Sequence, residues 1–175
     1  MNKHRNIAFA ALNTAVLVII SMLSMPIGGV PLSFQCLAVA MGGYICGAKS
    51  AMAATAVYIA LGAVGLPVFS SFRAGASVLF DYTGGFIWGF FAIALLCGIA
   101  RGKGNTASIA AGLLGLIICH TVGVLQFRAV AGVSIKSALL TASLPFLIKD
   151  VLLIIAANLL SMQILRALSK NKNNK

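Results

Sequence analysis

The chain has 175 residues, of which 61% are hydrophobic and only 9% are charged, whereas about a quarter of the residues of a soluble domain are charged. A bilayer accepts such an apolar exterior, so we expect a single membrane domain over residues 1–175 with a basic tail at 169–175. The 13 Lys and Arg residues outnumber two acids, Asp81 and Asp150. They flank apolar runs singly and form no stripe, which indicates membrane flanks and excludes a nucleic-acid surface.

Six apolar runs predict an all-α integral membrane protein with six transmembrane helices. In chain order the runs are 7–27, 34–47, 51–69, 84–100, 107–127 and 138–168. The first is too long for a signal peptide, so we expect it to remain as the first helix. The second is too short to span alone and should pack among the others. The sixth is overlong and contains Pro145, which predicts a break.

The distribution of Lys and Arg predicts that both termini lie in the cytoplasm. With the N-terminus inside, three basic residues face outward, namely Arg73, Arg128 and Lys136. Nine face inward: Lys3, Arg5, Lys49, Arg101, Lys103, Arg166, Lys170, Lys172 and Lys175. Lys149 falls within a span and is not counted.

Asp150 is the main functional candidate, because ionisable groups at membrane depth are costly. It follows Pro145 in the sixth run, where an acid in a pocket can accept N–H donors from a ligand. The alternative is a structural ion pair with Lys149 or Arg73. Adjacent residues of a helix point about 100° apart, so we expect Lys149 and Asp150 not to face one point directly.

Arg73 lies in an apolar, aromatic loop between the third and fourth runs. Its guanidinium can bind a carboxylate in a bidentate manner. We expect this loop to fold back as a lid over a pocket; the alternative is a loop on the bilayer surface. The other acid, Asp81, precedes the fourth run and is expected to cap that helix, a role that Thr83 could serve equally.

Three further polar side chains lie in or beside apolar runs. Gln35 opens the second run and either bonds a ligand or caps a helix. Tyr58 is interpreted first as packing within the bundle and second as a ligand contact. His120 is interpreted as a packed, neutral histidine in preference to a ligand contact or a proton relay.

Motifs for catalysis are missing, so we expect no enzyme and no catalytic residue. The sequence contains no HExxH, no phosphate-binding loop and no paired carboxylates, and two acids are too few for most hydrolytic or metal chemistry. The four cysteines form no CxxC pair, so we expect no metal site. Uphill transport would therefore need energy from a partner.

Three stretches resemble the BioY family, the biotin-binding S subunits of energy-coupling factor (ECF) transporters. Residues 29–39 (GVPLSFQCLAV) are similar to the family's GxVPxTxQxLAV. The second stretch, 58–69 (YIALGAVGLPVF), resembles YLxLGxxGLPVF and continues through the loop to 83–90 (TGGFIWGF), which is similar to PTGGYLxGF. Residues 144–150 (LPFLIKD) are similar to PFLPGD, which puts Asp150 on the family's acid. The chain departs from the family at Asp81–Tyr82, often Gly-Pro, and at Ile148–Lys149, often Pro-Gly.

The resemblance implies a compact S-subunit bundle, multi-pass in the bacterial cytoplasmic membrane, that captures biotin with high affinity near its outer face. It implies a coupling membrane protein and two ATPases as partners, and no cofactor in this chain, since the ATPases use the ATP. Ala11 and Ala15 match an AxxxA face that contacts the coupling protein. An S subunit for another vitamin or small heterocycle, and a scaffold without a small ligand, remain as alternatives.

The resulting hypothesis assigns roles around bound biotin. Arg73 or backbone N–H groups meet the carboxylate, and Asp150 accepts the N–H groups of the ureido ring, helped by Gln35 or Tyr58. The remaining predicted binding residues are Phe34, Phe72 and Tyr82, which cover the apolar rings, and Lys149.

Overall fold

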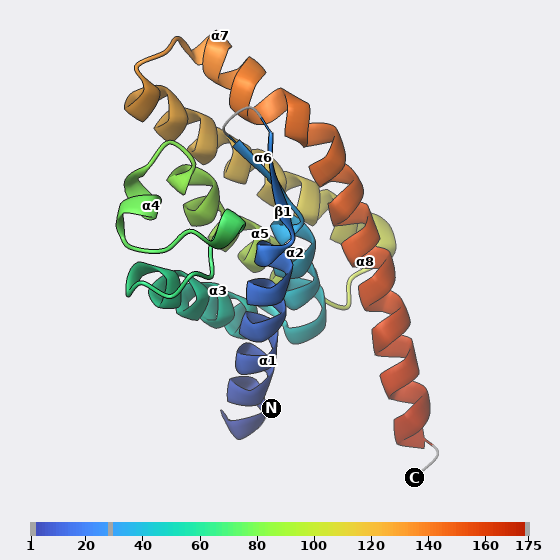
Figure 1. The fold of residues 1–175 in the computed structure, drawn as a ribbon. Coiled ribbons are helices and arrows are strands. Elements are labelled where there is room, and N and C mark those ends of the chain that lie inside the picture. The colour runs from blue at the N-terminus through green and yellow to red at the C-terminus, as the bar shows by residue number, and fades with distance from the viewer. Residues whose placement is uncertain (1–2, 28–29, 174–175) are drawn as a thin grey trace.

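The computed structural model describes residues 3–27 and 30–173 as a helical bundle (Figure 1). The longer helices are α1 (Lys3–Met22), α2 (Gln35–Cys46), α3 (Ala48–Ala63), α5 (Gly84–Ile99), α6 (Asn105–Ala131) and α8 (Leu144–Asn173). The shorter elements are β1 (Ser24–Ile27), β2 (Val30–Ser33), the 3₁₀ turn η1 (Ser70–Phe72), α4 (Ser77–Phe80), α7 (Ile135–Ala138) and the π-helical η2 (Leu139–Ser143).

The short helix α2 lies at the centre of the bundle, in contact with α1, α3, α5 and α8. Nine of its 12 residues are buried. The expectation that the second apolar run packs among other helices is therefore confirmed. A glycine at 47 with φ of +82° separates α2 from α3, because a left-handed backbone ends a helix and favours glycine.

Glycines on α5 let its backbone approach α6 closely. A Cβ added at Gly89 would lie 2.6 Å from Cys119 Cα, and one at Gly85 would lie 2.6 Å from the Val122 carbonyl oxygen. No side chain fits at these separations, so only glycine permits this contact. The close contact brings the first turns of α5 next to the middle of α6.

The first helix is shorter than expected, because α1 ends at Met22 and does not reach Ile27. The chain turns there into an antiparallel hairpin that pairs Ser24 with Ser33 and Ile27 with Val30. Proline at 26 has no N–H to donate and so cannot continue a helix. Likewise α3 ends at Ala63, before residue 69, as the chain enters a turn with φ of +103° at Gly65.

The expected break at Pro145 is wrong. The chain stays helical from Ile135 to Asn173 through α7, η2 and α8. The wider π turn of η2 comes immediately before the proline. Such a turn can absorb the hydrogen bond that proline removes, so the helix adjusts locally and continues.

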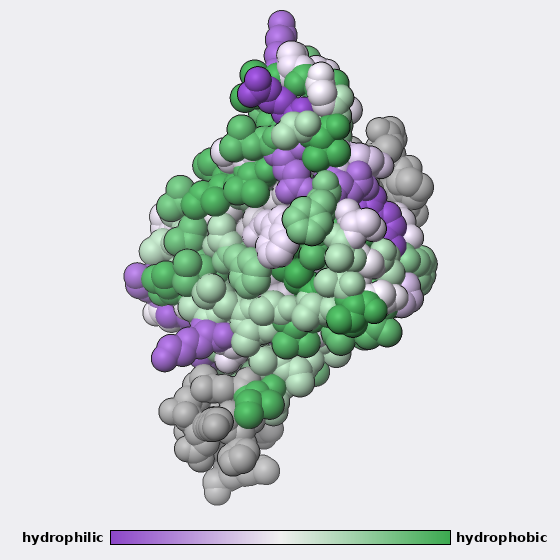
Figure 2. All heavy atoms as spheres, turned by 90° about the vertical axis from the view of Figure 1, so that its left-hand side faces the viewer, coloured by the Kyte–Doolittle hydropathy of each residue, from purple (hydrophilic) through white to green (hydrophobic). Residues whose placement is uncertain are grey.

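Polar and apolar side chains are distributed in the manner of a membrane protein. Among buried residues are Asn13, Thr14 and Ser21, while Ile117 and Leu125 of α6 are at least half exposed. Apolar side chains cover much of the face on the side of α3 and α4, and hydrophilic ones gather in its upper part (Figure 2). Two helices, Asn105–Ala131 and Ile135–Lys170, are long and apolar enough to cross a bilayer.

Candidate ligand-binding site

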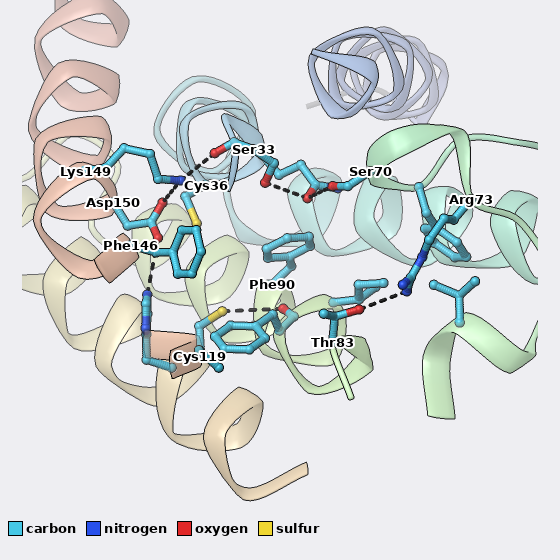
Figure 3. Close-up of a pocket in the computed structure, with 17 residues that line it drawn as sticks. Ser33, Cys36, Ser70, Arg73, Thr83, Phe90, Cys119, Phe146, Lys149 and Asp150 are labelled. Atoms are coloured by element: carbon cyan, nitrogen blue, oxygen red, sulfur yellow. Dashed lines mark hydrogen bonds and ion pairs between the residues drawn. The ribbon is translucent and has the colours of Figure 1, made fainter. Parts of the chain in front are cut away.

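A cavity of about 70 Å³ opens between α2, the 64–83 loop and helices α5, α6 and α8. We call it the Asp150 cavity. Its lining residues are Ser33, Gln35, Cys36, Phe69, Ser70, Arg73, Val78, Thr83, Phe86, Ile87, Phe90, Cys119, His120, Ala142, Phe146, Lys149 and Asp150. Polar groups lie at its two sides, with Lys149 and Asp150 at one and Arg73 at the other, and Phe90 lies between them (Figure 3).

Asp150 is 5% exposed and touches two cationic or ionisable partners. Its Oδ1 lies 2.7 Å from Lys149 Nζ, and its Oδ2 lies 3.4 Å from His120 Nε2. Oδ1 nevertheless accepts no hydrogen bond of regular geometry from the described residues. The carboxylate is thus paired with the Lys149 ammonium, faces the His120 ring and has acceptor positions left for a ligand in the cavity.

Lys149 and His120 are themselves held by other residues. Lys149 Nζ donates to the Ser33 carbonyl oxygen at 2.5 Å, which ties α8 to the hairpin. His120 Nδ1 lies 2.8 Å from Ser143 Oγ in the π turn. The π turn of η2 therefore serves the site, because it places Ser143 against the ring that faces Asp150.

Gln35 organises a second group of hydrogen bonds at the start of α2. Its Oε1 accepts from Ser33 Oγ at 2.9 Å and from Ser70 Oγ at 2.7 Å, and its Nε2 donates to Tyr58 OH at 2.6 Å. These bonds join α2, α3 and the η1 turn. The amide is therefore pre-positioned, with one Nε2 hydrogen left for another acceptor.

Arg73 lies at the opposite side of the cavity in a polar cluster with Asp81 and Thr83. Its Nη1 donates to Asp81 Oδ2 at 3.1 Å, and its Nη2 donates to Thr83 Oγ1 at 2.8 Å. The guanidinium has five N–H donors, so further donors remain for an anion. The 64–83 loop thus brings a positively charged group to the cavity, held in place by its own acid.

Apolar side chains line the space between the charged groups. Phe69, Phe90 and Phe146 are at most 7% exposed and line the cavity together with Ile87 and Val78. An apolar wall with polar groups at both ends fits a molecule with a hydrophobic middle, one donor-rich end and one anionic end.

The structure brings four of the predicted residues together: Asp150, Lys149, Arg73 and Gln35 all line the Asp150 cavity. Tyr58 lies one layer behind, fully buried and bonded to Gln35. Its expected packing role is confirmed, and its help to the ligand stays a prediction.

The aromatic side chains predicted to cover the ligand are not among the lining residues. Phe34 is 41% exposed and Phe72 is 62% exposed. Positive φ angles of 59° at Ser71 and 58° at Phe72 make a tight turn there, and Phe72 is exposed on it. Tyr82 is half buried and meets Phe127 edge-to-face, with ring centroids 5.8 Å apart.

Two expectations about acids are wrong. Asp81 does not cap α5, because Thr83 is the N-cap residue and makes no side-chain cap bond, while Asp81 pairs with Arg73. Lys149 and Asp150 do meet, although they are neighbours on a helix. A lysine side chain has a flexible four-carbon stem, so its ammonium can curl back to an adjacent carboxylate.

His120 is the cavity residue that sequence reasoning underrated. It is buried, as expected, but it faces Asp150 and lines the cavity. Its position inside an apolar run was the available signal, because ionisable groups at membrane depth often mark function. Cys36, Ser70 and Thr83 also line the cavity and carried no signal of their own. Among the described residues no group of three His, Cys, Asp or Glu could hold a metal ion.

Comparisons with known proteins identify the family of this chain. The family model described as BioY family matches residues 1–170. The biotin transporter BioY of Thermotoga maritima is 33% identical over 162 residues, covering 91% of this chain and 95% of that protein. The probable biotin transporter BioY of Pyrococcus horikoshii is 30% identical over 149 residues, covering 85% and 89%.

The fold also matches a solved structure. The crystal structure of an S-component for biotin from an ECF-type ABC transporter aligns with a TM-score of 0.86 and covers 95% of both chains. Its sequence is only 22% identical, so this likeness concerns the fold.

Proposed function

This chain belongs to the BioY family, and from that membership together with the Asp150 cavity we propose that it captures biotin for uptake across the bacterial cytoplasmic membrane. It would do so as the substrate-binding subunit of an ECF-type transporter. The observation that carries the proposal is the arrangement of an acid with a free acceptor position, an apolar wall and an arginine along one cavity.

The groups of biotin match this order. Its ureido ring offers N–H donors to Asp150 and a carbonyl oxygen to Lys149 or the free hydrogen of Gln35. Its sulfur-containing ring is apolar and would contact Phe90 and Phe146, and its carboxylate would meet Arg73. Each polar group buried without a partner costs about 1–3 kcal/mol, so a ligand that lacks one of these groups should bind more weakly.

The cavity must widen to admit a ligand. Its volume is about 70 Å³, and pockets for small molecules usually enclose about 300 Å³ or more. The Lys149 ammonium lies between the Ser33 carbonyl and Asp150, so its long side chain is the part that can move at little cost. Movement of the η1 turn would open the opposite side and is consistent with the predicted lid.

For orientation we propose six membrane spans with both termini in the cytoplasm. The spans are α1, α2, α3, α5, α6 and the continuous helix from α7 to α8. Figure 1 shows both described ends of the chain at the same side of the bundle, which supports an even number of spans. Nine basic residues on the inner side against three on the outer side support a cytoplasmic position for both termini. In this orientation the Asp150 cavity lies toward the outer face, and 169–175 is a cytoplasmic tail.

The energy to release biotin into the cytoplasm would come from partner proteins. From its membership in the BioY family we propose a coupling membrane protein and two ATPase subunits as partners, and the sequence contains no phosphate-binding loop of its own. Ala11 and Ala15 are both exposed on α1. They lie four residues apart on one helix face, and small side chains allow another helix to approach closely. This face is the proposed contact for the coupling protein.

The proposal is tested by binding labelled biotin to the purified protein in detergent, with unlabelled biotin and biotin methyl ester as competitors. Biotin should saturate a single site, and the methyl ester should compete less well because it lacks the anion that Arg73 meets. Mass spectrometry of ligands that co-purify provides an independent check. Another small heterocycle in the cavity would replace biotin as the substrate, and a protein that binds no ligand would favour a scaffold.

A further inference from the structure

A second cavity opens at the start of α6, between the 101–104 turn and the C-terminal half of α8. We call it the Arg101 cavity. Its volume is about 270 Å³, which makes it larger than the Asp150 cavity at about 70 Å³. Fifteen residues of α6 separate Asn105 in this cavity from His120 in the other, a distance of about 22 Å along the helix. The two cavities are therefore distinct sites.

The charged residues of the Arg101 cavity are all cationic. Arg101, Lys103 and Arg166 line it, and no carboxylate does. The only two acidic side chains in the sequence are engaged elsewhere, since Asp81 pairs with Arg73, and Asp150 with Lys149 and His120. The positive charge of this cavity is thus not compensated by any acidic side chain of the chain.

The N-terminus of α6 adds backbone donors to the same place. Its N-cap residue is Gly104, which has no side chain to accept a hydrogen bond from the helix. The first helical bond runs from Ser108 N to the Gly104 carbonyl oxygen at 3.0 Å. The N–H groups of residues 105–107 therefore have no acceptor within the helix, and the helix dipole favours an anion beside them.

A buried hydroxyl in this cavity has no partner. Ser161 of α8 lines the cavity and is 1% exposed, and its Oγ makes no hydrogen bond to the described residues. A serine in a helix commonly bonds a carbonyl one turn back, so an unsatisfied hydroxyl at this depth is unusual. Nearby, Asn158 Nδ2 donates to Asn105 Oδ1 and so ties α8 to the start of α6.

From these features we propose that the Arg101 cavity binds a phosphate group, supplied by the head group of an anionic phospholipid. A phosphate has several oxygens that can accept from guanidinium groups, from helix N–H groups and from Ser161 Oγ together. Met162 and Leu165 also line the cavity, so apolar side chains lie next to the cations, as the head group and first acyl carbons of a lipid require. The proposed orientation places this site in the cytoplasmic leaflet, where anionic lipids attract Lys and Arg.

The test uses the full chain, stripped of lipid in detergent and studied by native mass spectrometry. Phosphatidylglycerol and phosphatidylcholine are titrated separately, and inorganic phosphate is added as a competitor. The protein should bind at least one phosphatidylglycerol roughly tenfold more tightly than phosphatidylcholine, because only the former carries net negative charge. Biotin binding is measured on the same samples, so failure of this site and failure of the Asp150 cavity are told apart.

Variants locate the bound lipid. The double variant Arg101→Gln/Arg166→Gln should lose roughly tenfold or more in phosphatidylglycerol affinity, and Ser161→Ala should lose a few-fold. Lys103→Gln/Arg166→Gln is the alternative if the first variant does not fold, since Arg101 also donates to the Cys46 carbonyl oxygen at 3.4 Å. Arg128→Gln is the matched control, because Arg128 is exposed in the last turn of the same helix.

Each result decides the proposal. Selective binding of phosphatidylglycerol that depends on Arg101 and Arg166 supports it, and displacement by inorganic phosphate would show that the phosphate group alone suffices. Equal binding of both lipids, or an equal loss in the Arg128→Gln control, overturns it. In that case the three cations would be free to receive an acidic segment of a partner protein.

Discussion

The two cavities differ in one respect that decides what each can hold. The Asp150 cavity places an acid among Lys149, His120 and, further away, Arg73, whereas the Arg101 cavity contains cations alone. The first can therefore bind a molecule that donates hydrogen bonds at one end and carries an anion at the other. The second favours an anion, because its charged residues are all cationic. The chain has only two acidic residues, so their positions determine which cavity carries a negative charge.

The packing of α5 on α6 gives the largest expected effect. Gly89→Val would put side-chain atoms into the Cys119 backbone, because even a Cβ there would lie 2.6 Å from Cys119 Cα. Overpacking of this kind costs about 1–3 kcal/mol or more. We expect a clear fall in melting temperature in detergent and loss of biotin binding, since both helices line the Asp150 cavity.

The matched control for this variant is Gly104→Ala. A Cβ at Gly104 has nothing within 4 Å, and its φ is −55°, so the expected cost is only that of an alanine at an N-cap position, about 1 kcal/mol or less. Comparable destabilisation by both variants would show that the α5–α6 contact is not specially tight.

The next largest effect is expected when the acid Asp150 is replaced. Asp150→Asn keeps the shape but removes the charge and replaces one acceptor by a donor, so biotin should bind at least roughly tenfold more weakly. Phosphatidylglycerol binding should not change, because Asp150 lies outside the Arg101 cavity. Equilibrium binding of labelled biotin measures the first quantity, and unaltered affinity would remove Asp150 from the binding site.

The arginine at the other side of the Asp150 cavity is tested with two ligands. Arg73→Lys keeps the charge but loses the planar fork that binds a carboxylate through two N–H groups. Biotin affinity should fall by roughly fivefold, about 1 kcal/mol. The affinity for biotin methyl ester, which is already lower than that for biotin, should be the same in Arg73→Lys and in the wild type. A parallel loss with both ligands would show that Arg73 acts through Asp81 and Thr83 and not on the carboxylate.

The buried tyrosine should have a smaller effect. Tyr58→Phe removes the acceptor of the 2.6 Å bond from Gln35 Nε2, which corresponds to about 0.5–1.5 kcal/mol or roughly two- to tenfold in biotin affinity. Isothermal titration of wild type, Tyr58→Phe, Gln35→Ala and the double variant separates direct from indirect action. Additive losses would contradict a role for Tyr58 in positioning Gln35.

The smallest effect is expected at Phe72, which is 62% exposed. Phe72→Ser should change biotin affinity by less than about twofold, since surface substitutions usually stay within ±0.5 kcal/mol. A tenfold loss would mean that the η1 turn closes over bound biotin and brings Phe72 onto it, as the sequence-based lid hypothesis predicts.

Sequence alone determined the class of this protein and much of its site. Because so few residues are charged, the exterior must face lipid. An acid inside an apolar run costs free energy at membrane depth and therefore indicates a binding site. Asp150 could be selected on this ground, and Arg73 because it is a cation in an apolar, aromatic loop, whereas Gln35 stayed open between a ligand contact and a helix cap. The apolar runs also indicated where most of the long helices lie, because a segment in lipid must form all its backbone hydrogen bonds within itself.

Tertiary structure decided the contacts that depend on residues distant in the chain. The contact of His120 with Asp150 and the bond of Ser70 to Gln35 join segments whose distance depends on how the helices pack. The π turn before Pro145 likewise replaced a predicted break. Local patterns report burial and propensity, but which side chains meet is set by helix packing. The division between the Asp150 and Arg101 cavities therefore emerged only with the fold.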